Sequence, residues 1–211
     1  MGEATKQQER KVVLIACSAK KKEKQCAAEF MYTSDLFRKS LAYALTLGAD
    51  KIYILSAKYG LLTLDEEIKP YDVSLNTMPI DEVRDWSNMV IAQIKKKEKI
   101  TKTHFVLFAG SRYRKFITPH LRSYEVPLEG RGIGEQISIL KNKLIELHGG
   151  DGTSASFVSD EVLVNWLCGF YRVKEKEARK LLRDQGRKNW MEVRASAWGM
   201  KVSPVIEKME R

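Results

Sequence analysis

The sequence predicts an α/β fold with a central, mostly parallel four-stranded sheet, flanked by helices and followed by a C-terminal helical extension. Two observations favour it: four short apolar runs alternate with helical patterns, and each run ends in a cluster of small or polar residues. Such runs are typical of buried strands in a parallel sheet, whose ligands bind beyond the carboxyl ends of the strands. The expected strands cover Lys11–Ala16, Lys51–Leu55, His104–Phe108 and Tyr124–Leu128.

Between these runs, apolar residues recur at helical spacing. Ser34 suits the N-cap of the first helix and Gly48 its end, while Pro79 suits a first helical turn. Residues 57–78 form a long connection, of a length that is usually functional or mobile in compact domains. The expected helices cover residues 35–47, 79–96, 111–121 and 134–147.

The stretch Gly149–Ser154 is the clearest linker in the chain and divides it into two parts. We expect an α/β domain over residues 1–148 and a small basic helical segment over 155–211. Residues 157–211 hold 12 Lys/Arg against 8 Asp/Glu, a net charge of +4. Two interpretations remain open for this segment: a nucleic-acid-binding module, or a lid that packs on the first domain.

The charge composition indicates what kind of partner the protein binds. The 211 residues carry a formal net charge of +10, which favours a polyanionic partner, and we expect nucleic acid, with DNA favoured over RNA. The alternative is a basic but inert surface. No apolar run reaches the length of a membrane span, and the first eleven residues lack the apolar core of a signal peptide. A cytoplasmic protein without a membrane partner is expected.

Cysteine and histidine are scarce. The three cysteines, Cys17, Cys26 and Cys168, have irregular spacing that fits neither a disulfide framework nor a zinc site. The three histidines form no metal-ligand pair. We therefore expect no metal and no cofactor.

The clusters after the strands carry the candidate chemistry. Cys17-Ser18-Ala19-Lys20 suits a phosphate cradle of backbone N–H groups and lysines, or simply a turn of small residues. The small residues Ser56 and Ala57 would let a ligand come close to the strand end, and Gly60 permits a turn of the backbone there. Lys58 adds a cation and Tyr59 an aromatic ring. A tight turn with Tyr59 buried would show the same pattern. Gly110, Arg112 and Tyr113 lie at a helix start and suit an anion beside an aromatic ring. Arg131 lies in a glycine-rich junction between a strand and a helix.

Tyr71 and Asp72 lie in the long connection after Pro70. Tyr71 could stack on a base, and Asp72 could orient water or stabilise a developing cation. By spacing alone, Asp72 is better explained as a turn residue that caps a backbone N–H.

Five motifs of this chain resemble those of a bacterial and phage family whose members are described as similar to YaaA-type peroxide-stress proteins. The motifs are Cys17-Ser18-x-Lys20, Tyr32-x-Ser34-x-x-Phe37, Leu55–Leu61, Pro70-Tyr71-Asp72 and Ala109-Gly110-x-x-Tyr113. The first motif is also similar to the glycosylase-like domain of archaeosine synthase. The resemblance covers about residues 11–147 and implies a uracil-DNA-glycosylase-like α/β architecture. The Asp-Pro-Tyr and His-Pro-Ser motifs of those glycosylases do not occur in the chain.

We therefore expect a nucleic-acid-directed enzyme that cleaves or exchanges the N-glycosidic bond of a base, modified or not, through a glycosylase-like domain. The alternatives are a non-catalytic DNA-binding stress protein and a hydrolase of free nucleotides or nucleosides. Asp72 and Lys58 are the expected catalytic residues. The expected substrate-binding residues are Cys17, Ser18, Lys20, Ser34, Ser56, Tyr59, Tyr71, Gly110, Tyr113 and Arg131.

Overall fold

The computed structural model describes residues 9–148 together with positions 176, 179–180 and 183–184. Its described part forms two compact units, each built from separate stretches of chain. The first unit contains residues 9–17, 49–62 and 73–130, and the second contains residues 18–48, 63–72 and 131–148. The expected helical segment over 155–211, with Cys168 and its tryptophans, lies outside the described residues apart from the five positions above.

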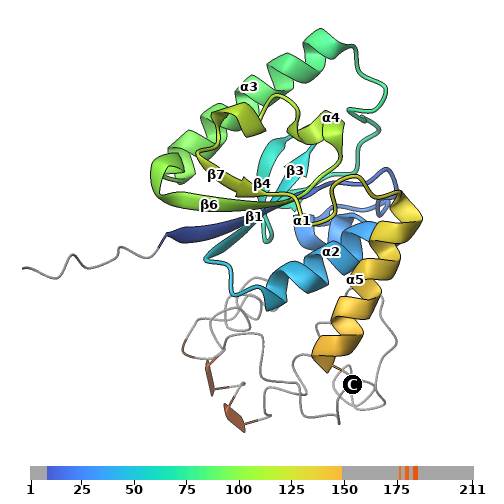
Figure 1. Cartoon of the computed structure of the whole chain (residues 1–211). Helices are drawn as coiled ribbons and strands as arrows, with labels where there is room; N and C mark the ends of the chain where they lie inside the picture. The colour runs from blue at the N-terminus through green and yellow to red at the C-terminus, as the bar shows by residue number, and fades with distance from the viewer. Residues whose placement is uncertain (1–8, 149–175, 177–178, 181–182, 185–211) are drawn as a thin grey trace, which may run out of the picture. The chain divides into compact units, whose positions relative to one another are not determined.

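The first unit is built on a mostly parallel sheet with strand order β4-β3-β1-β6-β7 (Figure 1). β1 (Arg10–Ala16) pairs in parallel with β3 (Lys51–Ser56) and with β6 (Thr103–Phe108), and β6 pairs in parallel with β7 (Ser123–Glu125). Val12 to Ile15 are at most 1% exposed because β1 is central and covered on both faces. This double burial explains a continuous apolar run without polar alternation.

The four-strand prediction is wrong, because the sheet has a fifth strand, β4 (Gly60–Thr63). Only Ala57–Tyr59 separate β3 from β4, and so short a link allows a hairpin but no parallel crossover. The connection expected over 57–78 therefore begins as sheet. It also contains β5 (Glu67–Ile68), which pairs with β2 (Cys26–Ala27) within the second unit.

A proline explains two further differences between the predicted and the observed elements. The expected strand over 124–128 is β7 over Ser123–Glu125, because Pro127 has no N–H to donate to a ladder. The helix expected over 111–121 is instead α4 (Ser111–Arg114) followed by the 3-10 turn Thr118–His120. Pro119 cannot continue an α-helix, since its ring would clash with the preceding turn.

The long helix of the first unit, α3 (Ile80–Lys97), agrees with its prediction to within one residue at each end. Its buried residues recur at helical spacing and include Val83, Trp86 and Val90, and Figure 1 shows the helix beside the sheet. Asp81 and Glu82 lie in its first turn and lysines in its last, where each charge suits the helix dipole.

The second unit contains α1 (Ala28–Met31), α2 (Asp35–Thr46) and α5 (Ile133–His148). The Phe37 N–H donates to Ser34 Oγ at 3.3 Å, so Ser34 caps α2 as predicted. Gly48 follows the helix with a φ of 61°, the left-handed conformation expected at a helix end. α2 and α5 lie side by side in Figure 1.

Candidate functional site

The candidate site lies where the parallel strands of the first unit end. Because β3 and β6 both run parallel to β1, the carboxyl ends of the three strands meet at one edge, as the sequence predicted. The residues at these strand ends are Cys17, Ser56–Tyr59 and Ala109–Tyr113, and we call this region the carboxyl edge. It contains six of the twelve residues proposed for the site: Cys17, Ser56, Lys58, Tyr59, Gly110 and Tyr113.

Cys17 lies at the centre of the carboxyl edge and contacts both neighbouring loops. Its half-buried Sγ is 3.2 Å from the Tyr113 hydroxyl and accepts a hydrogen bond from the Ala57 N–H at 3.4 Å. Its own N–H donates to the Leu55 carbonyl at 2.9 Å. The partners of this thiol are thus a phenol and backbone amides. Cys17 joins the ends of three strands, and none of these partners is a base that would activate a thiol nucleophile.

Ser56 shapes the turn between β3 and β4. Its fully buried Oγ accepts from the N–H groups of Lys58 at 3.3 Å and Tyr59 at 3.1 Å, which fixes the turn. Its carbonyl accepts from the Trp86 indole N–H at 2.9 Å. Trp86 also meets Tyr113 edge to face, with 5.5 Å between the ring centroids. One α3 side chain therefore supports the loops after both β3 and β6.

The same turn has no room for a side chain at Gly60. Gly60 has a φ of 75°, and a Cβ placed there would lie 2.2 Å from Gln93 Oε1 and 2.9 Å from Met89 Cε. Gln93 Oε1 accepts from the Leu61 N–H at 2.7 Å, and Gln93 Nε2 donates to the Tyr59 carbonyl at 3.3 Å. The turn thus requires glycine for its backbone conformation and for the close approach of α3.

Lys58 is the exposed cation of this turn. Its ammonium lies 5.2 Å from the centre of the half-buried Tyr59 ring, while its backbone is held by Ser56. A flexible charged head on a fixed backbone suits a group that must reach a ligand. The carboxyl edge therefore offers a positive charge and an aromatic ring on one rigid turn.

Gly110 and Arg112 differ in what they do at this edge. Gly110 is exposed, and no described atom outside its chain neighbours lies within 4 Å of the position that a Cβ would take. Arg112 points instead to the preceding loop, donating through Nε to the Leu75 carbonyl at 2.7 Å and through Nη2 to the Met78 carbonyl. Arg112 thus holds the 75–78 loop against α4, where sequence reasoning had suggested an anion contact.

The second unit contains another group of candidate side chains around Tyr71. The Tyr71 hydroxyl is 2.8 Å from that of Tyr32, which is only 1% exposed. The Lys21 ammonium lies 4.4 Å from the centre of the Tyr71 ring, a cation–π distance. Asp72 follows directly, is exposed, and makes no hydrogen bond or ion pair with another described residue.

The other predicted residues of the second unit have local partners. Ser18 Oγ donates to the Lys20 carbonyl at 3.1 Å, so the two form a turn, and the Lys20 side chain is exposed. Arg131 pairs with Glu135 at 2.6 Å, one helical turn along the chain. Burial raises the pKa of the half-buried Cys26 thiol, which keeps it in the unreactive protonated form.

Metal ligands do not gather in the part of the chain that the structure describes, where no three His, Cys, Asp or Glu side chains are close enough to hold an ion. Within the same residues, no helix is both long and apolar enough to cross a membrane.

Comparison with known families gives one match. The model of DUF6884, a family of unknown function, matches residues 12–142. The chain belongs to this family. The matched region contains all twelve of the proposed site residues and both units of the described structure apart from their outermost residues. No curated protein and no solved structure matches the chain.

Sequence reasoning missed three residues that build these sites: Trp86, Gln93 and Tyr32. Trp86 and Gln93 lie two helical turns apart on α3 and so share a face, which helical spacing predicts as core. The sequence contained a usable signal, since both residues carry polar groups and a polar group on a buried face needs a partner. Tyr32 occurs in a quoted motif, but its pairing with Tyr71 joins residues 39 positions apart.

Proposed function

We propose that this protein is an enzyme that cleaves or exchanges the N-glycosidic bond of a base in nucleic acid, with Lys58 of the carboxyl edge among its catalytic residues. The observation that carries the proposal is the meeting of three strand ends at Cys17, beside the exposed Lys58 and the open Gly110. Open parallel sheets bind their ligands at such an edge. The likeness of the first motif, Cys17-Ser18-x-Lys20, to a glycosylase-like domain is in line with the same reaction.

The chemistry needs two charge-stabilising groups. When the bond between C1′ and the base nitrogen breaks, its electron pair leaves with the base and C1′ becomes an oxocarbenium-like cation. In hydrolysis, water adds to C1′ and releases one proton, while the departing base gains one; in exchange, the nitrogen of an incoming base replaces the water. Electrostatic stabilisation of both charges is the largest contribution that such a site can make.

Lys58 and Asp72 are assigned these roles. The Lys58 ammonium would donate a hydrogen bond or a proton to the departing base. The Asp72 carboxylate would stabilise the sugar cation or accept the proton of the attacking water. Asp72 is exposed and makes no hydrogen bond or ion pair with another described residue, so its charge is available for this purpose. Tyr59 or Tyr71, both half-buried, would stack on an extruded base.

The test is mass spectrometry of the products that the full chain releases from modified and unmodified DNA and RNA. We expect a free or exchanged base from at least one substrate, and a rate loss of about a hundredfold or more in Lys58→Ala and in Asp72→Asn. Lys115→Ala and Asp65→Asn are matched controls, because both are exposed residues in the same respective units. Melting curves should be the same for all four variants.

Three results would count against the proposal. Full turnover in both Lys58→Ala and Asp72→Asn would remove these residues from the mechanism. A wild-type protein that binds DNA but releases no base from any substrate would favour a non-catalytic DNA-binding protein. Turnover of free nucleotides alone would favour a small-molecule hydrolase.

A further inference from the structure

The opposite edge of the same sheet, where the parallel strands begin, is a row of cations. β3 begins with Lys51 and β1 with Arg10, while Lys102 and Arg122 directly precede β6 and β7. These four strands are neighbours in the order β3-β1-β6-β7. Neighbouring strands lie about 4.8 Å apart, so the row is on the order of 14 Å long. We call this region, with the lysines that end α3, the amino edge.

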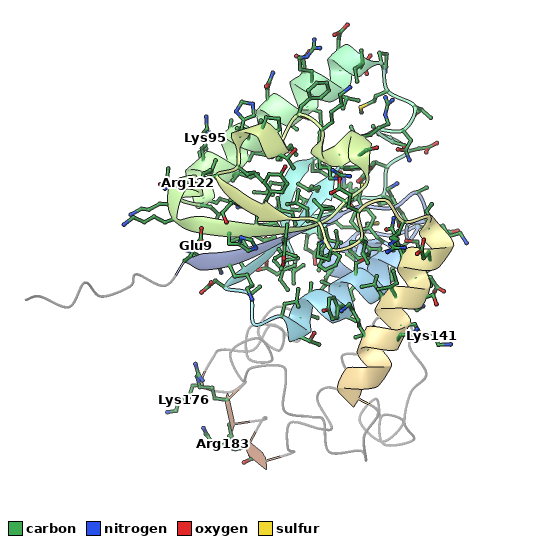
Figure 2. The ribbon with its side chains drawn as sticks, viewed as in Figure 1. Glu9, Lys95, Arg122, Lys141, Lys176 and Arg183 are labelled. Atoms are coloured by element: carbon green, nitrogen blue, oxygen red, sulfur yellow. The ribbon has the colours of Figure 1, made fainter. Side chains whose placement is uncertain are left out.

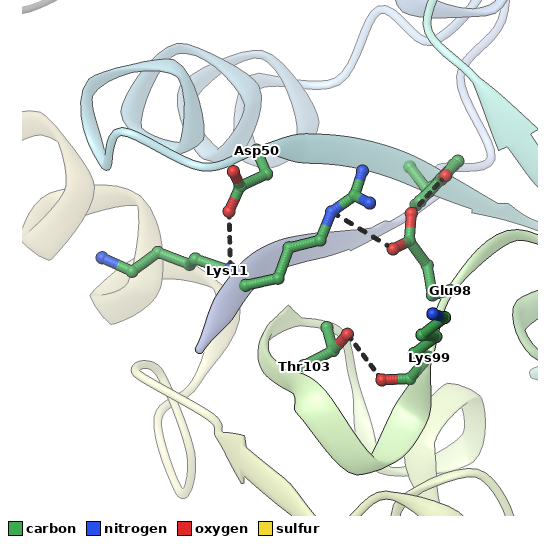
Figure 3. A network of polar contacts seen from close by, with 7 residues as sticks. Lys11, Asp50, Glu98, Lys99 and Thr103 are labelled. Atoms are coloured by element: carbon green, nitrogen blue, oxygen red, sulfur yellow. Dashed lines mark hydrogen bonds and ion pairs between the residues drawn. The ribbon is translucent and has the colours of Figure 1, made fainter. Parts of the chain in front are cut away.

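Two acidic side chains beside this row, Glu98 and Asp50, form hydrogen bonds or ion pairs with residues of the same unit. Glu98, 5% exposed, accepts from the Tyr53 hydroxyl at 2.7 Å and pairs with Arg10 at 3.4 Å. Asp50 accepts from the Lys11 backbone N–H at 2.8 Å, as Figure 3 shows. Asp50, Glu9 and Glu125 are exposed carboxylates nearby, and Glu125 lies 3.9 Å from His104. Glu98 thus contributes little to the outward surface, which is mainly cationic.

A count of charged residues shows that cations outnumber carboxylates at the amino edge. Nine Lys/Arg and four Asp/Glu occur in residues 9–11, 50–51, 95–102 and 122–125, a net charge of +5 out of +10 for the whole chain. The dipole of α3 explains why lysines suit its last turn, residues 95–97. It does not explain Lys51, Lys99 or Arg122, which lie outside that helix.

The lysines after α3 are joined to the row of strand starts. The Thr103 hydroxyl donates to the Lys99 carbonyl at 2.9 Å, and the pairing of His104 with Ser123 places Arg122 beside Thr103. Figure 2 labels Lys95 and Arg122 at the same end of the first unit. In the described part of the chain, Lys95, Lys99 and Arg122 are exposed and form no ion pair.

We propose that the amino edge binds the phosphodiester backbone of nucleic acid and serves as an anchoring surface separate from the carboxyl edge. Phosphates of one DNA strand rise 3.4 Å apart along the helix axis, so a 14 Å row of cations spans about four of them. Tyr124 of β7 is 46% exposed at the end of the row and offers a ring on which an unpaired base can stack.

A lipid surface fits these residues less well. An interfacial membrane site needs a continuous apolar face to insert below the headgroups. Among the described residues beside the row, Tyr124 is an exposed large apolar side chain, and most of the other exposed side chains are charged. Nucleic acid needs only phosphate contacts and a stacking ring, both of which are present.

The anchoring surface rests on the proposed function only for the identity of the partner. It requires no chemistry at Lys58, and its contacts lie at the other end of each strand. A long substrate would be held at the amino edge while one of its bases reacts elsewhere. Substitutions at the amino edge are therefore expected to weaken nucleic-acid binding, and substitutions at Lys58 to slow turnover.

The experiment measures fluorescence anisotropy of a labelled 20-nucleotide DNA, single-stranded and duplex, with the full chain. The double variant Lys99→Glu/Arg122→Glu is compared with the matched control Lys115→Glu/Lys141→Glu, which changes the net charge equally at exposed positions elsewhere. We expect the first pair to weaken binding on the order of tenfold at moderate salt, and to lower the salt slope by about 1.8 on duplex DNA. The control pair should change affinity by less than about twofold.

An equal loss in both pairs would show attraction to net charge alone and would overturn the proposal. No loss in the first pair, or binding to phosphatidylserine vesicles but not to DNA, would also overturn it. If no variant and no wild-type protein releases a base, but Lys99→Glu/Arg122→Glu alone loses DNA binding, the anchoring surface stands and the proposed reaction falls.

Discussion

The two ends of the first unit's strands are built from different chemistry. The carboxyl edge is held by uncharged contacts: the Cys17 thiol, the Ser56 hydroxyl and the Trp86 indole bond to neutral partners. The amino edge is held by a buried carboxylate, Glu98, between Tyr53 and Arg10, and is surrounded by exposed lysines. The strands are the same, so the difference arises from the side chains that pack around each of their ends.

The two edges should therefore differ in how their stability depends on salt and pH. Contacts between neutral groups are barely affected by salt and pH, whereas contacts of charged groups depend on both. The carboxyl edge should therefore keep its geometry under conditions that alter the amino edge. Variants at each edge can test this difference.

The largest expected effect is that of Trp86→Ala. Trp86 is 6% exposed, and its removal leaves a cavity beside Tyr113 and a buried Ser56 carbonyl without its donor. We expect a loss of about 3–5 kcal/mol in the free energy of unfolding, measured by urea denaturation. Trp86→Phe keeps most of the volume and should lose about 1–2 kcal/mol. A Trp86→Ala loss that changed strongly with salt would contradict the neutral character of this edge.

A smaller loss is expected for Gly60→Ala. The left-handed φ of 75° costs about 1–2 kcal/mol with a Cβ, and the clash with Gln93 adds the loss of its two hydrogen bonds. We expect a total of about 2–3 kcal/mol by the same measurement. Gly110→Ala is the matched control, because Gly110 has a φ of −65° and open space, and should change stability by less than about 0.5 kcal/mol. Equal effects at both glycines would refute this account of the turn.

The smallest effect concerns pH at the amino edge. Burial, followed by the hydrogen bond and charge of Glu98, raises the pKa of Tyr53 from its ordinary value of 10. The folded protein then keeps a proton that the unfolded chain loses, so this stability is complete below pH 10 and falls as pH rises above it. Between pH 10 and 11 the advantage of the wild type over Tyr53→Phe should shrink by on the order of 1 kcal/mol. A constant difference between pH 8 and 11 would contradict the raised pKa.

The sequence allowed much of this sheet to be predicted. The core strands were recognisable because β1, β3 and β6 are buried on both faces, which requires unbroken apolar runs. α3 was recognisable from its spacing, and Ser34 from the preference of serine for N-caps. The clustering at the carboxyl edge followed from parallel pairing alone.

The remaining features depend on contacts between residues far apart in the sequence. β4 is four residues long, too short for its period to distinguish it from a loop, and it is stabilised through Gln93, 32 positions after Leu61. The clamp of Arg112 on the Leu75 carbonyl spans 37 positions. No local pattern could separate that arginine from one that binds an anion. Glycine at position 60 was the exception, because its need for a positive φ was predictable from the turn.

The central position of β1 also determines when the chain can fold during synthesis. Arg10 pairs with Thr103, so 93 further residues must be synthesised after the start of β1 before its second neighbour, β6, begins. At typical translation rates of about 5–20 residues per second, that interval is on the order of 5–20 seconds. During this time one side of the apolar segment Val12–Ala16 has no partner. The nascent chain should therefore need chaperone protection until β6 has emerged.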